Sequence, residues 1–217
     1  FSAGWSLIKF YFMVGLPTET KEDVEAIADL AVRARKEAQG KKAQINVSVS
    51  TFVPKPHTPF QWSGQISLEE TKERINQLMH RLPRKGFKLK WHEPEQSFLE
   101  GVFSRGDRRL SLVIEDAWRA GAKLDGWSDY FSLVRWQTAA ERTGIDLESY
   151  LRPREMDEPL PWDHLQAGVD SAFLKEEYAR SLKREYTPDC RNRGCQKCGL
   201  CDFKSLKPLT HQRDPLP

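Results

Sequence analysis

The sequence has no cysteine before residue 190, no long apolar run and little net charge. All four cysteines fall between Cys190 and Cys201, so disulfides cannot cross-link the rest of the chain, and a reducing, cytoplasmic compartment is expected. No apolar run approaches the roughly 20 residues that span a bilayer, so we expect no membrane partner. The formal charge of +3 over 217 residues is too small to imply a nucleic-acid partner by itself, and local basic clusters are a separate matter.

The chain also lacks an initiator methionine and the basic region of a signal peptide. It opens with Phe1-Ser2-Ala3-Gly4, shortly before an apolar run, and this indicates a piece of a longer protein. With 30% charged and 39% hydrophobic residues, its composition is typical of an ordinary soluble globular protein of one or two domains.

The stretch of residues 7–59 organises the sequence. Residues 7–14 are β-favouring and mostly apolar, which predicts a strand covered on both faces, as in parallel sheets. Gly15-Leu16-Pro17 ends that strand. A helix follows, with a capping box at Thr20 and Asp23 and an expected stop at Gly40.

A second strand is predicted over residues 44–52, where apolar and polar residues alternate. A strand, a helix and a strand in this order form one right-handed βαβ unit of an α/β sheet or barrel. The apolar face should meet the helices, and the Asn/Ser face should line something polar, such as a barrel lumen. The following loop, residues 53–60, contains three prolines and leaves the end of the strand that carries ligand sites in such folds.

The rest of the chain becomes increasingly helical. A second capping box, Ser67 to Glu70, begins a helix that ends at Pro83, and a half-exposed strand is predicted over residues 87–92. Helices are then expected near residues 98–103, 107–121, 129–143, 146–151 and 170–184. We therefore expect three parts: residues 1–92, a helical extension over 93–185, and a cysteine-rich tail over 186–217.

The cysteine cluster is the strongest chemical signal. Cys190, Cys195, Cys198 and Cys201 are separated by four, two and two residues. Structural zinc sites usually pair two CxxC turns across a longer insert, whereas successive x2 steps favour an iron–sulfur ligand run. The spacing predicts a metal site, with an iron–sulfur cluster favoured over zinc and unligated cysteines as the alternative.

Residues 9–20, with the acidic helix that follows, and the loop from Phe52 to Pro59 resemble the fifth and sixth strands of radical S-adenosylmethionine enzymes of the methylthiotransferase and Elongator-like group. Later blocks are similar to one uncharacterised subfamily that carries a cobalamin-binding-like domain before the barrel. Those blocks are Lys90-Trp91-His92, residues 97–100 and 105–109, Asp125-Gly126-Trp127, residues 160–164 and the terminal cysteines.

The resemblance implies the C-terminal part of a partial (β/α) barrel that binds S-adenosylmethionine. Gly15 and Pro17 would contribute backbone contacts, and Phe52, Val53 and Pro54 would form the adenine-facing wall. A glycine permits close backbone approach, and a proline-stiffened apolar loop offers a preformed slot for a flat ring.

The chain departs from that family in several respects, and the first strands of the barrel are among the missing parts. The family's cluster motif, CxxxCxxC, has no counterpart among the spacings of this sequence, so no catalytic residue is assigned. The resemblance implies that the main iron–sulfur cluster, the amino-group-binding motif and any cobalamin belong to a missing N-terminal half of the same chain. The tail cysteines would be an auxiliary site.

Smaller signals have mostly structural interpretations. His57 is a possible ligand contact, and the pair Asp163-His164 is better explained by capping than by acid–base chemistry. Arg105-Gly106-Asp107 is a cell-adhesion tripeptide but is better interpreted as a helix start. The tryptophans at 118, 127, 136 and 162 are expected to supply a core.

A basic patch is interleaved with aromatic residues and suits an RNA backbone, although a solvated strand face is the simpler interpretation. Its members are Arg81, Arg84, Lys85, Lys88 and Lys90, with Phe87 and Trp91. The leading hypothesis is thus a fragment of a radical S-adenosylmethionine enzyme. The alternatives are an RNA-binding module with a structural zinc tail and a vestigial barrel, and an electron-transferring tail that serves another protein.

Overall fold

The computed structural model describes residues 1–39, 42–201 and 205–206. The chain forms two compact units. The first consists of the described residues of Phe1–Pro54 together with Ser63–Pro153, and the second of Lys55–Trp62 together with the described residues from Arg154 onward. The chain therefore passes between the units three times.

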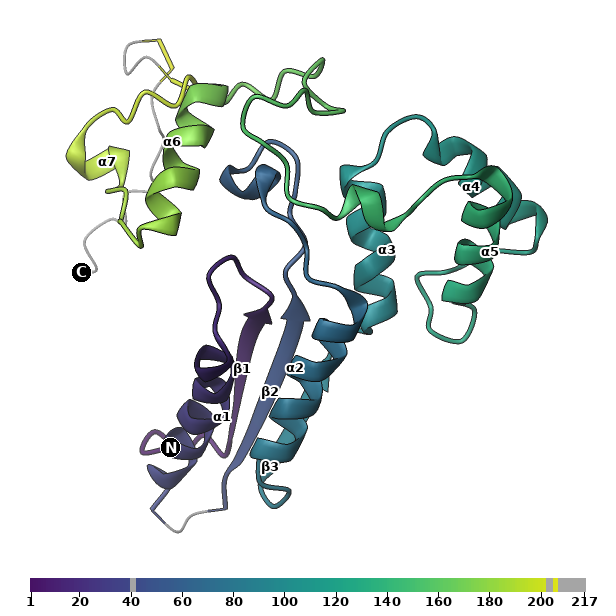
Figure 1. Cartoon of the computed structure of the whole chain (residues 1–217). Helices are drawn as coiled ribbons and strands as arrows, with labels where there is room; N and C mark the ends of the chain where they lie inside the picture. The colour runs from purple at the N-terminus through teal and green to yellow at the C-terminus, as the bar shows by residue number, and fades with distance from the viewer. Residues whose placement is uncertain (40–41, 202–204, 207–217) are drawn as a thin grey trace. The chain divides into compact units, whose positions relative to one another are not determined.

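The first unit contains an open, three-stranded parallel sheet. Its strands are β1 (Leu7–Val14), β2 (Gln44–Thr51) and β3 (Phe87–Trp91), in the order β1-β2-β3. Helix α1 (Lys21–Lys36) connects β1 to β2, and α2 (Leu68–Arg81) precedes β3. The predicted strand–helix–strand order is confirmed, and the protein is an α/β protein (Figure 1).

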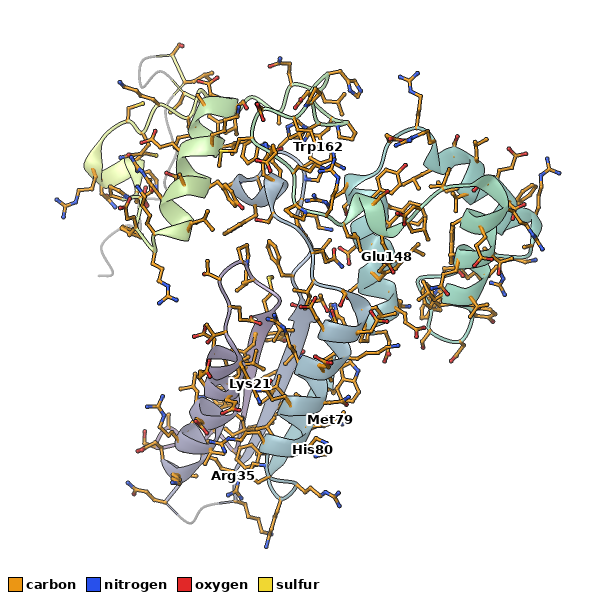
Figure 2. All side chains as sticks on the ribbon, viewed as in Figure 1. Lys21, Arg35, Met79, His80, Glu148 and Trp162 are labelled. Carbon is orange, nitrogen blue, oxygen red and sulfur yellow. The ribbon has the colours of Figure 1, made fainter. Side chains whose placement is uncertain are left out.

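Both crossover helices begin where the local sequence predicts. Thr20 caps α1 in a reciprocal capping box with Asp23, and Ser67 caps α2 in the same way with Glu70. Lys21 and Arg35, labelled in Figure 2, mark the first and last turns of α1. The residue predicted to stop this helix, Gly40, lies outside the described residues.

Helices α1 and α2 lie along one face of the sheet (Figure 1). The alternation of β2 is confirmed, because Ile45, Val47 and Val49 are buried under these helices. The prediction that β1 is covered on both faces is wrong: Tyr11 is 72% exposed and Met13 45%. Apolar residues on both sides of a strand do not specify a second covering layer, and both helices pack on the same side.

Three further helices complete the first unit: α3 (Pro94–Arg105), α4 (Leu110–Arg119) and α5 (Leu133–Thr143), followed by a short 3₁₀ turn, η2 (Glu148–Tyr150). Trp136 is buried in their core, but Trp118 and Trp127 are 65% and 68% exposed. The prediction that all four tryptophans are core residues is therefore wrong for these two. The buried side of α4 is filled by Leu110, Val113 and Ala117, which leaves Trp118 outside, and Trp127 lies on the connection between α4 and α5.

Arg105 bridges two segments of the first unit that are distant in the sequence, one at Ser63 and one at residues 150–152. Its side chain is fully buried, and its guanidinium donates to the carbonyl oxygens of Ser63 (2.6 Å), Tyr150 (2.8 Å) and Arg152 (2.7 Å). Those segments also pair through their backbones, because Gln65 N–H donates to Leu151 O over 2.9 Å. The arginine of the Arg105-Gly106-Asp107 tripeptide is thus a structural residue.

The second unit is built from η1 (Pro59–Trp62), α6 (Ser171–Leu182) and a short helix, α7 (Cys190–Arg193). Its core comprises Trp62, Leu160, Trp162 and Leu174. The buried Gln61 side chain accepts a hydrogen bond from Trp162 Nε1 (2.7 Å), which ties the Pro-rich loop to this core. Within the described residues, no helix is both long enough and apolar enough to cross a membrane.

Candidate functional site

The carboxyl ends of β1 and β2 lie side by side. Val14 is paired with Thr51 in the parallel register, and the Phe52 N–H donates to the Val14 carbonyl over 2.8 Å. This hydrogen bond joins the start of the Pro-rich loop to the end of β1. Two segments that sequence reasoning assigned to one site therefore leave the sheet at the same edge.

Gly15 begins the loop after β1 in a left-handed conformation, with φ +90°. A Cβ at this position would also lie 2.8 Å from Ile66 Cδ1, so glycine meets both a backbone and a packing requirement. Its N–H donates to both carboxylate oxygens of Glu19, over 3.0 and 3.1 Å. The Gly15 N–H is thus occupied within the protein, and Ile66 fills the space beside its Cα, so Gly15 shapes the loop from within.

Glu19 is held in turn by an ion pair with Arg74 of α2. The side chains are 7% and 21% exposed, respectively, and burial lowers the pKa of the Arg74 guanidinium. The pair locks the β1–α1 loop onto the second crossover helix. Sequence reasoning did not assign either residue to the site, because the partners lie 55 positions apart and neither carries a local signal.

The predicted wall residues differ in their exposure. Phe52 and Pro54 are buried, whereas Val53 and Pro17 are half-buried. Leu16, which the sequence-based site did not include, is 38% exposed. A ligand at this edge would therefore touch Val53, Pro17 and Leu16, while Phe52 and Pro54 support the loop from within.

The uncovered face of the sheet carries three lysines, with polar residues on β2 and the exposed Leu7, Tyr11 and Met13 on β1. The register places Lys9, Asn46 and Lys88 in one row, and Tyr11, Ser48 and Lys90 in the next. The Lys9 Nζ lies 4.5 Å from the centre of the Tyr11 ring.

The structure divides the predicted basic patch. Lys88 and Lys90 point to the uncovered face, but Phe87 and Trp91 alternate to the helix-covered side of β3. Arg81 pairs with Asp29 of α1 over 3.1 Å. The predicted interleaving of cations and aromatic rings on one surface is therefore wrong, because neighbouring residues of a strand face opposite ways. Tyr11 of β1 is an aromatic residue that lies on the same face of the sheet as Lys88 and Lys90.

All four cysteines of the tail lie in the second unit, and none of them forms a disulfide. Cys190 begins α7, and the N–H of Lys197 donates to Cys195 Sγ over 3.3 Å. Four thiols are a suitable donor set for zinc or an iron–sulfur cluster. Among the residues that the structure describes, however, no three His, Cys, Asp or Glu side chains converge closely enough to share a metal ion.

The remaining sequence candidates have local structural roles. Asp163 accepts a hydrogen bond from the Leu160 N–H (2.7 Å) in a turn, so its carboxylate has a local structural role. His57, at φ +57°, donates its N–H to Gln61 Oε1 over 3.0 Å in the Pro-rich loop. Asp107 accepts from the Arg109 side chain, which lowers its pKa to about 2, and from the Tyr150 hydroxyl over 3.2 Å.

Part of the chain is similar to an archaeal protein. No protein-family model and no solved structure matches the chain. An uncharacterized protein of Methanocaldococcus jannaschii is 31% identical over 112 residues, which cover 52% of this chain and 24% of that protein. The matched part thus spans about a quarter of that relative's length.

Proposed function

We propose that this chain is the C-terminal part of a radical S-adenosylmethionine enzyme and contributes the adenine-side wall of the cofactor site. The observation that carries the proposal is the meeting of Gly15 and Phe52 at the carboxyl edge of a parallel sheet, joined by the Phe52 N–H to Val14 O hydrogen bond. In parallel α/β folds this edge is where ligands bind. The uncovered sheet face would then line the lumen of a partial barrel.

Within this proposal the chain's own residues bind and orient the cofactor. Val53, Pro17 and Leu16 offer partly exposed apolar surface to the adenine, and the Glu19–Arg74 pair fixes the loop that carries two of them. When bound, S-adenosylmethionine and an iron–sulfur cluster supply radical chemistry at C–H bonds. The residues for that main cluster, and any cobalamin, belong to a longer protein, and Cys190, Cys195, Cys198 and Cys201 form an auxiliary metal site.

Binding of S-adenosylmethionine to the 217-residue chain, measured by titration calorimetry, tests the wall directly. Leu16→Ser should weaken binding about tenfold, because an apolar contact worth about 1.4 kcal/mol is lost. Leu112→Ser, at an exposed position of α4, is the matched control and should leave the affinity unchanged. Equal affinities for both variants would remove Leu16 from the site.

The reaction itself is tested on a longer protein that carries the CxxxCxxC motif. Under anaerobic conditions with a strong reductant, it should release 5′-deoxyadenosine. The absence of this product from the reconstituted protein would overturn the proposed enzyme class.

The uncovered sheet face favours a second candidate, an RNA-binding module with a structural zinc tail and a vestigial barrel. Its ten outward positions on the three strands include Lys9, Lys88 and Lys90 but no acidic residue. A salt-sensitive shift with tRNA in iron-free protein would support it. Lys88→Ala should then flatten the salt dependence by about one phosphate contact, whereas Lys123→Ala, exposed on the α4–α5 connection, should not.

A further inference from the structure

We infer that metal binding by the tail begins at Cys195 and Cys198, which form a preformed half-site seated on the N-terminal cap of α6. Cys190 and Cys201 close on the ion afterwards. The inference rests on the proposed four-cysteine metal site and adds an order of assembly and a positioning residue, Asp170.

The segment from Cys195 to Gly199 has the local geometry of a metal-binding turn. The Lys197 N–H donates to Cys195 Sγ, and Lys197 adopts φ +58°. Gly199, directly after the second cysteine, adopts φ +88°, a conformation that favours glycine. Backbone N–H groups directed at sulfur hold metal-binding cysteines in place, so the Cys195 sulfur is oriented before the ion arrives.

The turn is held in place by Asp170, the N-cap residue of α6. The Asp170 N–H donates to the Cys198 carbonyl over 2.9 Å, and a Cβ on Gly199 would lie 2.8 Å from Asp170 Cγ. A Cβ on Gly168 would similarly lie 3.2 Å from Leu200 Cδ2. Each loop therefore packs a glycine against a side chain of the other, and the backbone hydrogen bond from Asp170 positions the backbone of Cys198.

Cys195 is exposed and accessible to an ion. A cavity of about 400 Å³ lies beside it, lined in part by Arg180, Lys197 and Glu176. Arg180 is itself paired with Glu176 and Glu177, and the cavity gives an ion a path to the Cys195 sulfur. Metal binding at this pair releases the thiol protons to solvent and involves no redox step.

The other two cysteines belong to different local structures. Cys190 is the first residue of α7, whose cap residue Asp189 accepts from the Arg191 N–H, and Cys201 follows the turn by two residues. Because no three ligands converge within the described part of the chain, a four-thiolate site requires these two to move toward an ion already held by the pair. Such coupling of binding to local folding is common in small metal sites.

The experiment titrates Co²⁺ into the reduced, full 217-residue chain under anaerobic conditions and follows thiolate-to-cobalt absorption, with Zn²⁺ competition to give affinities. Cys195→Ser or Cys198→Ser should abolish the absorption. Cys190→Ser or Cys201→Ser should retain a weaker complex. Asp170→Pro removes the backbone N–H at a residue whose φ of −65° proline can adopt. This substitution should weaken Co²⁺ binding about 10- to 100-fold. Asp170→Ala, which keeps the N–H, should leave the Co²⁺ affinity unchanged.

The outcomes separate this inference from the metal site itself. A wild-type chain without cobalt–thiolate absorption would overturn both. Equal losses for all four cysteine variants, or equal affinities for Asp170→Pro and Asp170→Ala with α6 intact by circular dichroism, would overturn the half-site and leave the metal-binding tail standing.

Discussion

Replacing Arg105 with methionine should strongly destabilise the first unit. The guanidinium is fully buried and donates to the carbonyls of Ser63, Tyr150 and Arg152 over 2.6 to 2.8 Å. Methionine keeps most of the side-chain length but has no donor, so carbonyls from two segments of the chain lose their partner together. The substitution therefore tests whether one side chain holds those segments in place.

The expected loss is about 3–5 kcal/mol. Each hydrogen bond to a charged group contributes about 1.5–3 kcal/mol, and an unpaired buried carbonyl costs about 1–3 kcal/mol. Relief from burying a charge offsets part of that sum, which brings the net value to the range seen when one partner of a buried charged network is removed. Arg105→Lys should be intermediate, because an ammonium cannot span three acceptors in the geometry of a fork.

Urea unfolding followed by circular dichroism measures the change. With a slope of about 2 kcal/mol per molar urea, the midpoint should fall by roughly 1.5–2.5 M, and the Gln65 amide should lose protection from hydrogen exchange. Arg119→Met, which removes an exposed i,i+4 pair with Glu115, should cost only about 0.3–0.5 kcal/mol. If Arg105→Met lies within 1 kcal/mol of the wild type, the reasoning fails.

Two further predictions concern the acid limb of stability and the β1 loop. The pKa of Asp107 is lowered from 3.8 to about 2, chiefly by the Arg109 side chain. The contribution of this carboxylate to stability is therefore complete above pH 3.8 and disappears as the pH falls toward 2. Asp107→Asn should flatten the acid-unfolding curve between these pH values, and an unchanged curve would contradict the assignment. Gly15→Ala should lower the melting temperature more than Gly121→Ala. The two glycines have similar φ angles, +90° and +93°, but a Cβ would contact a neighbour, Ile66, only at Gly15. If that contact is the cause, adding Ile66→Ala should remove the additional loss in melting temperature.

Local signals predicted the frame of the sheet. The capping boxes at Thr20 and Ser67 fix the starts of α1 and α2 because their hydrogen bonds involve residues three apart. The alternation of β2 identified its covered face because successive side chains of a strand point to opposite sides. These features depend on neighbours along the chain, so the sequence displays them directly.

Long-range contacts were beyond such reasoning. The residues around Glu19 in the sequence do not predict its ion pair with Arg74. Those around Arg105 do not predict its hydrogen bonds to the carbonyls of Ser63 and Arg152. The exposure of Trp118 and the uncovered face of β1 depend on where other layers pack, which residue type alone does not determine. For the site, the convergence of Gly15 and Phe52 followed from parallel pairing, whereas the burial of Phe52 and Pro54 did not.

The passage of the Pro-rich loop into the second unit limits how the protein can be divided for study. Trp62 belongs to the same core as Trp162 and is only 2% exposed, yet it lies between β2 and α2 in the chain. A truncation after Pro153 would remove the core residues that bury the Trp62 indole and the Trp162 donor that hydrogen-bonds Gln61. Separate expression of the sheet unit thus requires two edits, removal of the C-terminal part and replacement of residues 55–62 by a short polar linker between Pro54 and Ser63.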